Sequence, residues 1–390
     1  MRKEDISMLK KLRNSYFSYF LMISFYYLSW ALFSSFISVY LLGKGLTTSQ
    51  VSIIVSVSFL VSMIFQPMIG ELCDKKGVKF IGILFIFAAI GGLLFSFSDH
   101  FITMMIGYSF VLMLINGANP ILEKIATASP FTYGKIRIWG TIGYALGSQF
   151  AGLIYEAISP KAIFITFIGT MLLCVLGTFL TEPSIAPQPK KQENKSNSLF
   201  KNKKFIYFLI ISALFFSATN MANTFIPSMF VHDGMSVKNA STVLGAAVLF
   251  ELPLVFFSNK FLDRLSNKFL IVVAFTISTL QFASYGFNLA MPIKIFMTFI
   301  SKHPMGMLYI MIQLKVVHTI VEENQVIPAL AIVATVKNLA SIFSQIAAGY
   351  LLEVFSYSYV FIIFAAILLV DVILAIFYKI EKGTDLQLFS

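Results

Sequence analysis

Two residues of opposite charge, Glu123 and Arg137, stand beside long apolar segments on either side of a short polar turn. The stretch PILEKIATASPFTYGKIRIWGTIGY, residues 120–144, is typical of one apolar helix that ends and another that begins. A charged side chain inside a membrane helix costs about 2.5–3.5 kcal/mol on insertion scales, so it usually pairs or lines a water-filled cavity. We predict that Glu123 and Arg137 face each other across neighbouring helices and line a polar cavity. The alternative is that Arg137 snorkels from an aqueous loop while Glu123 caps a helix end.

A second group of ionisable residues lies inside apolar segments of the C-terminal half, and it comprises Glu251, Lys302, His303, Lys337 and Asp371. Lys337 is about ten residues into its predicted helix, which is near mid-depth at about 1.5 Å per residue. Such a lysine needs a carboxylate or water, and Glu251 is the partner we predict. The alternatives are that Lys302 and Asp371 simply pack or snorkel, and that His303, which precedes Pro304, marks a kink in the helix.

These groups could couple transport to protons. A buried carboxyl takes up a proton more readily when a neighbouring cation moves away, and releases it when the cation returns. We assign this role to Glu251, His303, Lys302 and Glu123.

The elements that position these side chains are apolar. Hydrophobic residues make up 58% of the 390-residue chain and charged residues 12%, whereas soluble domains have about 25% charged residues. The chain is therefore predicted to be an integral, all-α membrane protein without a sizeable soluble domain. The charged first stretch, MRKEDISMLKKLRN, is unlike a cleavable signal, so a retained first helix is expected.

A spanning helix needs about 20 mostly apolar residues. Twelve segments fit, near residues 16–42, 48–70, 79–97, 101–126, 138–157, 161–181, 205–231, 240–258, 269–287, 292–319, 327–351 and 357–378. The lysines and arginines that make up the net charge of +11 gather in alternate loops. This bias predicts a multi-pass protein of the cell membrane with both termini in the cytoplasm, and it removes the reason to expect a nucleic-acid partner.

One long polar stretch, residues 182–204, is rich in Pro, Ser, Asn and Lys and is predicted to be a cytoplasmic linker. It divides the chain into an N-terminal six-helix bundle, residues 1–181, and a C-terminal six-helix bundle, residues 205–390. Such a repeat fits transport by rocking of one bundle against the other.

The repeat leaves a trace in two loops. GELCDKKGVKF, residues 70–80, carries Gly70, Asp74, Lys75 and Gly77, and NKFLDRLSNKF, residues 259–269, carries Asp263 and Arg264. The first resembles the loop signature of the major facilitator superfamily. That resemblance implies two six-helix bundles and an Asp that holds cytoplasmic helix ends together in one state.

Within that superfamily the chain most resembles the oligosaccharide:proton symporters. PILE and YGKIRIWGTIGYALG place Glu123 on the sugar-binding Glu of that group, Arg137 on its paired Arg, and Tyr144 on the aromatic residue that stacks on the sugar. KNLASIFSQIAAGYLLE places Lys337 on a lysine of the charge network, and FELP places Glu251 on a helix-eight Glu of the relatives.

The departures concern proton coupling. Two acidic positions of the family's seventh helix are Asn220 and Asn223 here, three residues apart and so on one helix face. His303 falls near the coupling His, but Gly306 stands where the family has its acid.

We therefore expect a secondary transporter, a proton symporter that takes up a small hydrophilic solute such as a sugar or oligosaccharide. Trp30, beside Tyr26 and Tyr27, suits the apolar face of a ring, and the remaining predicted substrate residues are Glu123, Arg137, Tyr144, Asn119, Asn220, Asn223 and Lys337. The alternatives are uptake of a nucleoside or small organic anion, and efflux of drugs or metabolites on the same fold. Efflux is disfavoured because the antiporters' fifth-helix prolines are missing between Gly140 and Ser159.

No cofactor other than the proton and no metal are expected, because the chain has four scattered His and two Cys without ligand spacing. The missing H-E-x-x-H and G-x-S-x-G patterns also argue against an enzyme. The expected partners are the solute, protons and the lipid bilayer, with the protein as a monomer.

Overall fold

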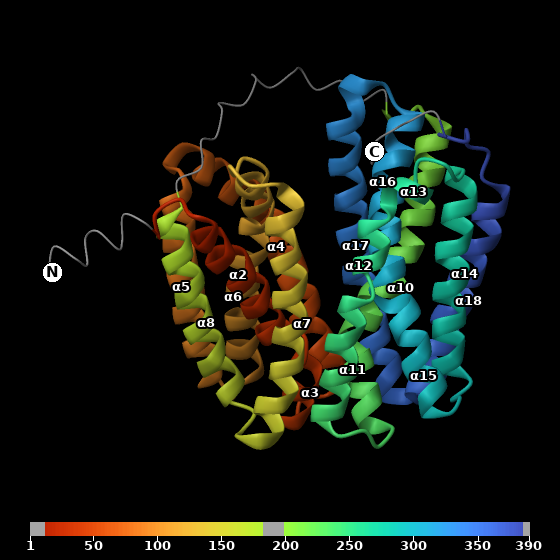
Figure 1. Cartoon of the computed structure of the whole chain (residues 1–390). Coiled ribbons are helices and arrows are strands. Elements are labelled where there is room, and N and C mark those ends of the chain that lie inside the picture. Colours follow the sequence, from red (N-terminus) through yellow and green to blue (C-terminus); the bar gives the residue numbers. More distant parts are fainter. Residues whose placement is uncertain (1–11, 182–198, 385–390) are drawn as a thin grey trace, which may run out of the picture. The chain divides into compact units, whose positions relative to one another are not determined.

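The computed structural model describes residues 12–181 and 199–384, and every regular element in these ranges is helical (Figure 1). The N-terminal helices are α2 (Tyr16–Ser34), α3 (Ile37–Gly43), α4 (Thr48–Lys76), α5 (Val78–Ser96), α6 (Phe101–Thr127), α7 (Tyr133–Ala157) and α8 (Ala162–Leu180). The C-terminal helices are α10 (Lys203–His232), α11 (Val237–Leu249), α12 (Leu252–Phe256), α13 (Ser258–Phe261), α14 (Asn267–Gly286), α15 (Met291–Met297), α16 (Pro304–Ile320), α17 (Val326–Val354) and α18 (Tyr357–Phe377). A π-helical turn, Thr298–Lys302, and a 3₁₀ turn, Glu323–Gln325, complete the set.

Eleven helical segments in the described residues are long and apolar enough to cross a membrane, against twelve predicted. The twelfth predicted segment, 138–157, corresponds to α7. This helix has 25 residues and reaches about 37 Å, which exceeds the roughly 30 Å hydrocarbon core. It falls short in apolarity because glycines and polar residues are frequent along it.

The chain divides into two compact units. Unit 1 comprises Met1–Pro189 and Ile226–Gly245, and unit 2 comprises Lys190–Phe225 and Ala246–Ser390. The prediction followed chain order and did not foresee that residues 226–245 pack with the N-terminal helices. Two hydrogen bonds hold them there, from the Ser241 hydroxyl to the Gln149 carbonyl at 3.1 Å and from the Lys238 amide to Glu156 Oε2 at 2.9 Å. The predicted linker, 182–204, lies outside the described residues up to 198.

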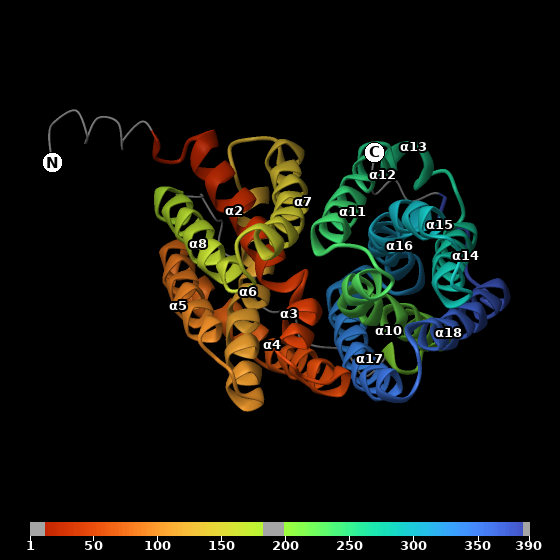
Figure 2. The same ribbon diagram turned by 90° about the horizontal axis from the view of Figure 1, so that it is seen from below.

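Within unit 1, α2 packs tightly on α7 (Figure 2). A stripe of small residues on α7 makes this possible. A Cβ atom on Gly143 would collide with the carbonyl oxygen of Ser24, and one on Gly147 with that of Leu28. The backbones therefore approach at a distance that only glycine allows, and side chains of α2 are brought beside those of α7.

Within unit 2, side-chain hydrogen bonds tie α10 to its neighbours α16, α17 and α18, which surround it in the end-on view (Figure 2). Asn220 Nδ2 donates to Ser341 Oγ of α17 at 2.6 Å, and Gln345 Nε2 donates to Thr224 Oγ1 at 2.6 Å. Buried polar groups that are paired in this way specify one arrangement of helices.

Two membrane segments of unit 2 are interrupted. Glu251 lies between the end of α11 and the start of α12. The π-helical turn Thr298–Lys302 separates α15 from α16, and His303 follows it. Helix breaks and π-turns occur frequently at functional sites.

The two motif loops differ in their surroundings. Gly77 ends α4 with a φ of +78°, which the missing Cβ permits, and Lys75 forms an exposed pair with Glu71 at 2.7 Å. The side chain of Asp74 lies outside the described part, and Gly70 has open space around it. Asp263 is buried beside Lys315, whose ammonium donates to carbonyls of the same turn, whereas Arg264 is exposed. The role of these loops in switching stays a prediction.

Candidate functional site

The carboxylate of Glu123 on α6 accepts two hydrogen bonds and forms one ion pair, and we call Glu123 with its partners Arg137, Tyr27 and Tyr133 the carboxylate site. Arg137 Nε lies 2.9 Å from Oε1, the Tyr27 hydroxyl donates to the same oxygen at 2.6 Å, and the Tyr133 hydroxyl donates to Oε2 at 2.7 Å. The predicted pairing of Glu123 with Arg137 across neighbouring helices is confirmed. Arg137 points at Glu123 and does not extend into a loop.

Arg137 is also held by an aromatic ring. Its guanidinium carbon lies 4.6 Å from the centroid of Tyr27, which is a cation–π distance. The side chains of Arg137 and Glu123 are 29% and 31% exposed. The pair is therefore only partly buried, and Arg137 is held on two sides, by Glu123 and by Tyr27.

Local sequence explains how the site is assembled. Tyr133 begins α7 and Arg137 follows four residues later, so both lie on one face of that helix. Tyr27 is brought to α7 by the glycine-mediated approach of α2. Tyr133 and Tyr27 are not among the site residues predicted from the sequence. The four-residue spacing before Arg137 is a signal that could have found Tyr133.

Aromatic rings continue the site along α2 and α7. Trp30 stacks on Tyr27 with centroids 5.9 Å apart, and Tyr144 meets Trp30 edge-on at 6.2 Å. Asn119 Oδ1 lies 3.3 Å from the Tyr27 hydroxyl. Of the predicted residues, Asn119 thus adjoins the hydroxyl that binds the carboxylate, while Trp30 and Tyr144 extend an aromatic row that starts at Tyr27.

Unit 2 contains a second polar group, which we call the lysine site. Lys302 Nζ donates to Asn223 Oδ1 at 2.9 Å and lies 3.1 Å from His303 Nε2. Glu251 is close enough to act electrostatically on Lys302. The break before α12 and the π-turn before α16 therefore bring three of the four predicted coupling residues together.

The predicted partner of Glu251 was wrong. Glu251 acts on Lys302, and the contact described for Lys337 is with an aromatic ring, because its Nζ lies 4.5 Å from the centroid of Phe216. Glu251 lies at the interruption between α11 and α12, and Lys302 ends the π-turn, and the apolar pattern of the sequence reveals neither feature. Asn220 and Asn223 share a helix face as predicted, but they bind Ser341 and Lys302 respectively.

Two further polar residues of unit 2, Gln345 and Ser341, have no sequence pattern that marks them as part of a polar site. Gln345 donates to the Asn220 carbonyl and to Thr224, and Ser341 accepts from Asn220. In the part of the chain that the structure describes, no cluster of three His, Cys, Asp or Glu side chains could hold a metal ion.

Comparison with known proteins agrees with this arrangement. Residues 19–325 match the model of the Major Facilitator Superfamily. The chain belongs to this superfamily. It is accordingly a multi-pass membrane transporter of the sugar and nucleoside permease type, and it is not an enzyme.

Several relatives are recognisable in sequence and in structure. An uncharacterized transporter of Bacillus subtilis, YwbF, is 25% identical over 82% of each chain. The sucrose permease of Escherichia coli is 28% identical over 51% of this chain and 52% of its own length. The solved structure of a variant of the nucleoside transporter NupG superposes with a TM-score of 0.81 at 16% identity, over 93% of this chain and 98% of the other. At that identity the structural likeness concerns the fold.

Proposed function

We propose that this transporter takes up a small hydroxyl-rich ring solute, with a sugar or oligosaccharide as first choice and a nucleoside as second, by alternating access coupled to protons. The observation that carries the proposal is the Glu123 carboxylate, held by Arg137 and two tyrosine hydroxyls beside an aromatic surface.

The carboxylate site matches the chemistry of such a solute. A carboxylate accepts hydrogen bonds from hydroxyl groups, and those of Tyr27 and Tyr133 occupy the positions that solute hydroxyls can take over. The rings of Trp30 and Tyr144 suit the apolar face of a sugar or a nucleoside. A site built to bind hydroxyls rejects analogues that lack them, because its own polar groups are then left unpaired.

The named relatives support both solute classes. Sucrose, raffinose and maltose permeases are among them. The nucleoside permease NupG of Escherichia coli is 31% identical over 40% of this chain and 41% of its own length. We rank sugars first because Glu123 pairs with Arg137 and because an aromatic row from Tyr27 through Trp30 to Tyr144 adjoins this pair.

A small organic anion is the second candidate function. The lysine site and Lys337 leave the C-terminal half with cations, while Asn220 and Asn223 carry no charge. A probable 3-phenylpropionic acid transporter of Escherichia coli is 22% identical over 68% of this chain and 73% of its own length.

Proton coupling is assigned to the lysine site. In our proposal Glu251 binds a proton when Lys302 moves away and releases it when the ammonium returns. His303, in contact with Lys302, can relay the proton through its ring. Glu123 is the corresponding candidate in unit 1. The protein is expected to act as a monomer in the cell membrane, with both termini in the cytoplasm.

Uptake into proteoliposomes tests the proposal. Labelled sucrose, maltose, uridine and 3-phenylpropionate are offered with and without an inward proton gradient. We expect one solute to accumulate, and Glu123→Gln to remove its binding. Glu71→Gln is the matched control, because Glu71 is an exposed carboxylate at the end of α4. If the solute accumulates equally with and without the proton gradient, the coupling is refuted. If it binds equally well to wild type and to Glu123→Gln, the site is refuted.

Lys302→Gln separates coupling from binding. We expect this variant to keep solute exchange across the membrane and to lose uptake driven by the gradient. If both activities fall in parallel, Lys302 belongs to solute binding, and the assignment of coupling to the lysine site is incorrect.

A further inference from the structure

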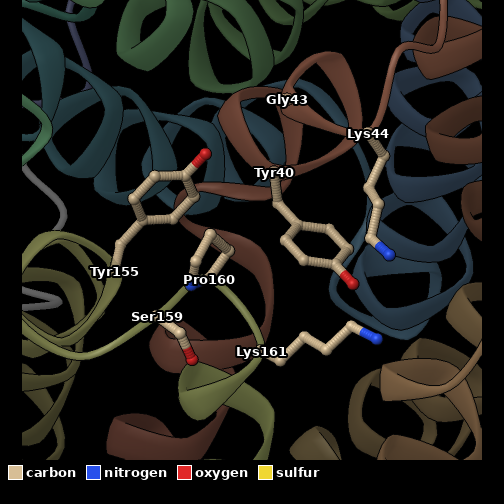
Figure 3. A pocket seen from close by; sticks show the side chains of 7 residues that line it. All are labelled: Tyr40, Gly43, Lys44, Tyr155, Ser159, Pro160 and Lys161. Atoms are coloured by element: carbon tan, nitrogen blue, oxygen red, sulfur yellow. The ribbon is translucent and has the colours of Figure 1, made fainter.

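A cavity of about 310 Å³ lies in unit 1, and none of its lining residues belongs to the carboxylate site. It is lined by Tyr40, Gly43, Lys44, Tyr155, Ser159, Pro160 and Lys161 (Figure 3). These residues come from the end of α3, the end of α7 and the turn before α8. This end of unit 1 has few basic residues in the sequence and is the predicted outer face.

The hydroxyl of Tyr40 is unsatisfied in the described structure. Tyr40 is 2% exposed, and its oxygen has no hydrogen-bond partner among the described residues. A buried hydroxyl without a partner is unfavourable by about 1–3 kcal/mol. In Figure 3 this hydroxyl points to the same side of the cavity as the ammonium groups of Lys44 and Lys161. An acceptor oxygen placed there would satisfy all three donors.

The charges around this point leave an excess of one positive charge. Lys44 pairs with Asp99 at 2.5 Å, and the positive charge of Lys161 also acts on Asp99. The pKa of Asp99 is lowered, first by the hydrogen bond from Lys44, then by the charge of Lys44 and that of Lys161. This carboxylate is therefore ionised at neutral pH. Two ammonium groups therefore share one carboxylate that is itself 63% exposed.

The opposite wall offers a second hydroxyl. A Cβ atom on Gly43 would come within 2.8 Å of the Tyr155 hydroxyl, so the glycine makes room for it. In Figure 3 this hydroxyl points toward Gly43, away from the lysines. The rings of Tyr40, Tyr155 and Pro160 line the space between. The cavity thus has a cationic end, an apolar middle and a neutral polar end, which suits an anionic group attached to a small organic body.

We propose that this cavity binds a phosphate ester at the outer end of unit 1. Phosphate fits better than a carboxylate because its several acceptor oxygens can meet two ammonium groups and the Tyr40 hydroxyl at once. The ester is either the headgroup of an anionic phospholipid or a free small phosphate. The cavity shares no residue with the carboxylate site, so it is separate from the proposed solute path.

Two variants and one control test the site. Lys161→Gln removes an exposed ammonium, and Tyr40→Phe removes the unpaired hydroxyl while keeping the ring. Lys79→Gln is the control, because Lys79 is an exposed lysine at the other end of unit 1. Tyr40→Phe leaves no buried group unpaired at this position, so it is expected to fold. The melting temperature without ligand checks this for every variant.

The two sources of phosphate are separated by two measurements. In detergent, binding of glycerol phosphate is measured by thermal shift. In nanodiscs, retention of phosphatidylglycerol over phosphatidylcholine is measured by native mass spectrometry. We expect either affinity to fall about tenfold in both site variants and to stay unchanged in Lys79→Gln, since a charge-assisted hydrogen bond is lost.

Each outcome decides the proposal. A thermal shift that depends on Lys161 and Tyr40 identifies a free phosphate, and selective lipid retention that depends on them identifies a headgroup. If neither probe distinguishes the two variants from wild type, or if Lys79→Gln weakens binding as much as they do, the proposal is overturned. Solute uptake is measured separately, so a failure of the proposed function does not affect this result.

Discussion

A double-mutant cycle on Glu123 and Arg137 tests whether their pairing organises unit 1. The variants are Glu123→Gln, Arg137→Met and the double substitution. Each single change leaves one charge without its counter-ion between helices, whereas the double change removes both charges. We expect the double variant to be about as stable as either single variant, so the two effects should not add.

The magnitude follows from burial. An exposed ion pair is worth about 0–1 kcal/mol, while removal of one partner from a fully buried pair costs about 3–5 kcal/mol. Glu123 and Arg137 are 31% and 29% exposed, and they form an ion pair with 2.9 Å between Oε1 and Nε. We therefore expect a coupling free energy of about 2 kcal/mol, or about thirtyfold in an equilibrium constant.

The assay is unfolding by SDS titration in mixed micelles, followed by tryptophan fluorescence. The chain has two tryptophans. Trp30 lies on α2 and Trp139 on α7, so the signal reports on the helices that hold the site. Because unfolding free energy is measured without solute, the result does not depend on which solute is transported.

A matched cycle on Glu71 and Lys75 provides the control. These side chains pair at 2.7 Å with an i,i+4 spacing on α4, and each is 68% exposed. Their coupling should be about 0.2–0.5 kcal/mol. If the effects of Glu123→Gln and Arg137→Met add within error, or if the control couples as strongly, the carboxylate site is not held together by this pair.

Three further predictions concern packing, burial and charge. Gly147→Leu should reduce the yield of folded protein, because the leucine side chain would collide with the α2 backbone. Gly169→Leu is the control and should not reduce it, because the space around Gly169 is open. Fluorescence-detected size exclusion measures both yields, and equal yields would contradict the packing argument. Asp371 is fully buried, and neither carboxyl oxygen has a hydrogen-bond partner in the described residues. Asp371→Leu should therefore raise the melting temperature by about 2–4 °C. A melting temperature below that of wild type would reveal a partner or role for the carboxyl. Asp99 competes for Lys44, and its lowered pKa keeps it ionised. Asp99→Asn should therefore strengthen glycerol phosphate binding throughout the range from about pH 5 to 8, and more toward pH 8, where the phosphate carries its second charge. A gain confined to acid pH would refute this.

The sequence by itself determined the class of fold and one ion pair. Runs of about 20 apolar residues cross a bilayer because their backbone hydrogen bonds are all made inside the helix. The positions of the spans therefore follow from where the apolar runs lie along the chain. Glu123 and Arg137 could be paired in advance because a short turn joins their helices, and few other charges lie near enough to compete. The glycine spacing on α7 permits close packing, and Gly143 and Gly147 lie against the α2 backbone.

Only the tertiary structure decided which distant groups meet. The sequence predicted Lys337 as the partner of Glu251, whereas in the structure Glu251 acts on Lys302, beside a helix break and a π-turn that apolar periodicity does not reveal. The two hydrogen-bond donors to Glu123 are the hydroxyls of Tyr27 and Tyr133, and Tyr27 comes within reach only because α2 packs on α7. The cavity at Tyr40 forms where three separate segments end together. Such contacts depend on how helices pack, and hydrophobic burial, which drives the packing, is too non-directional to specify them from sequence.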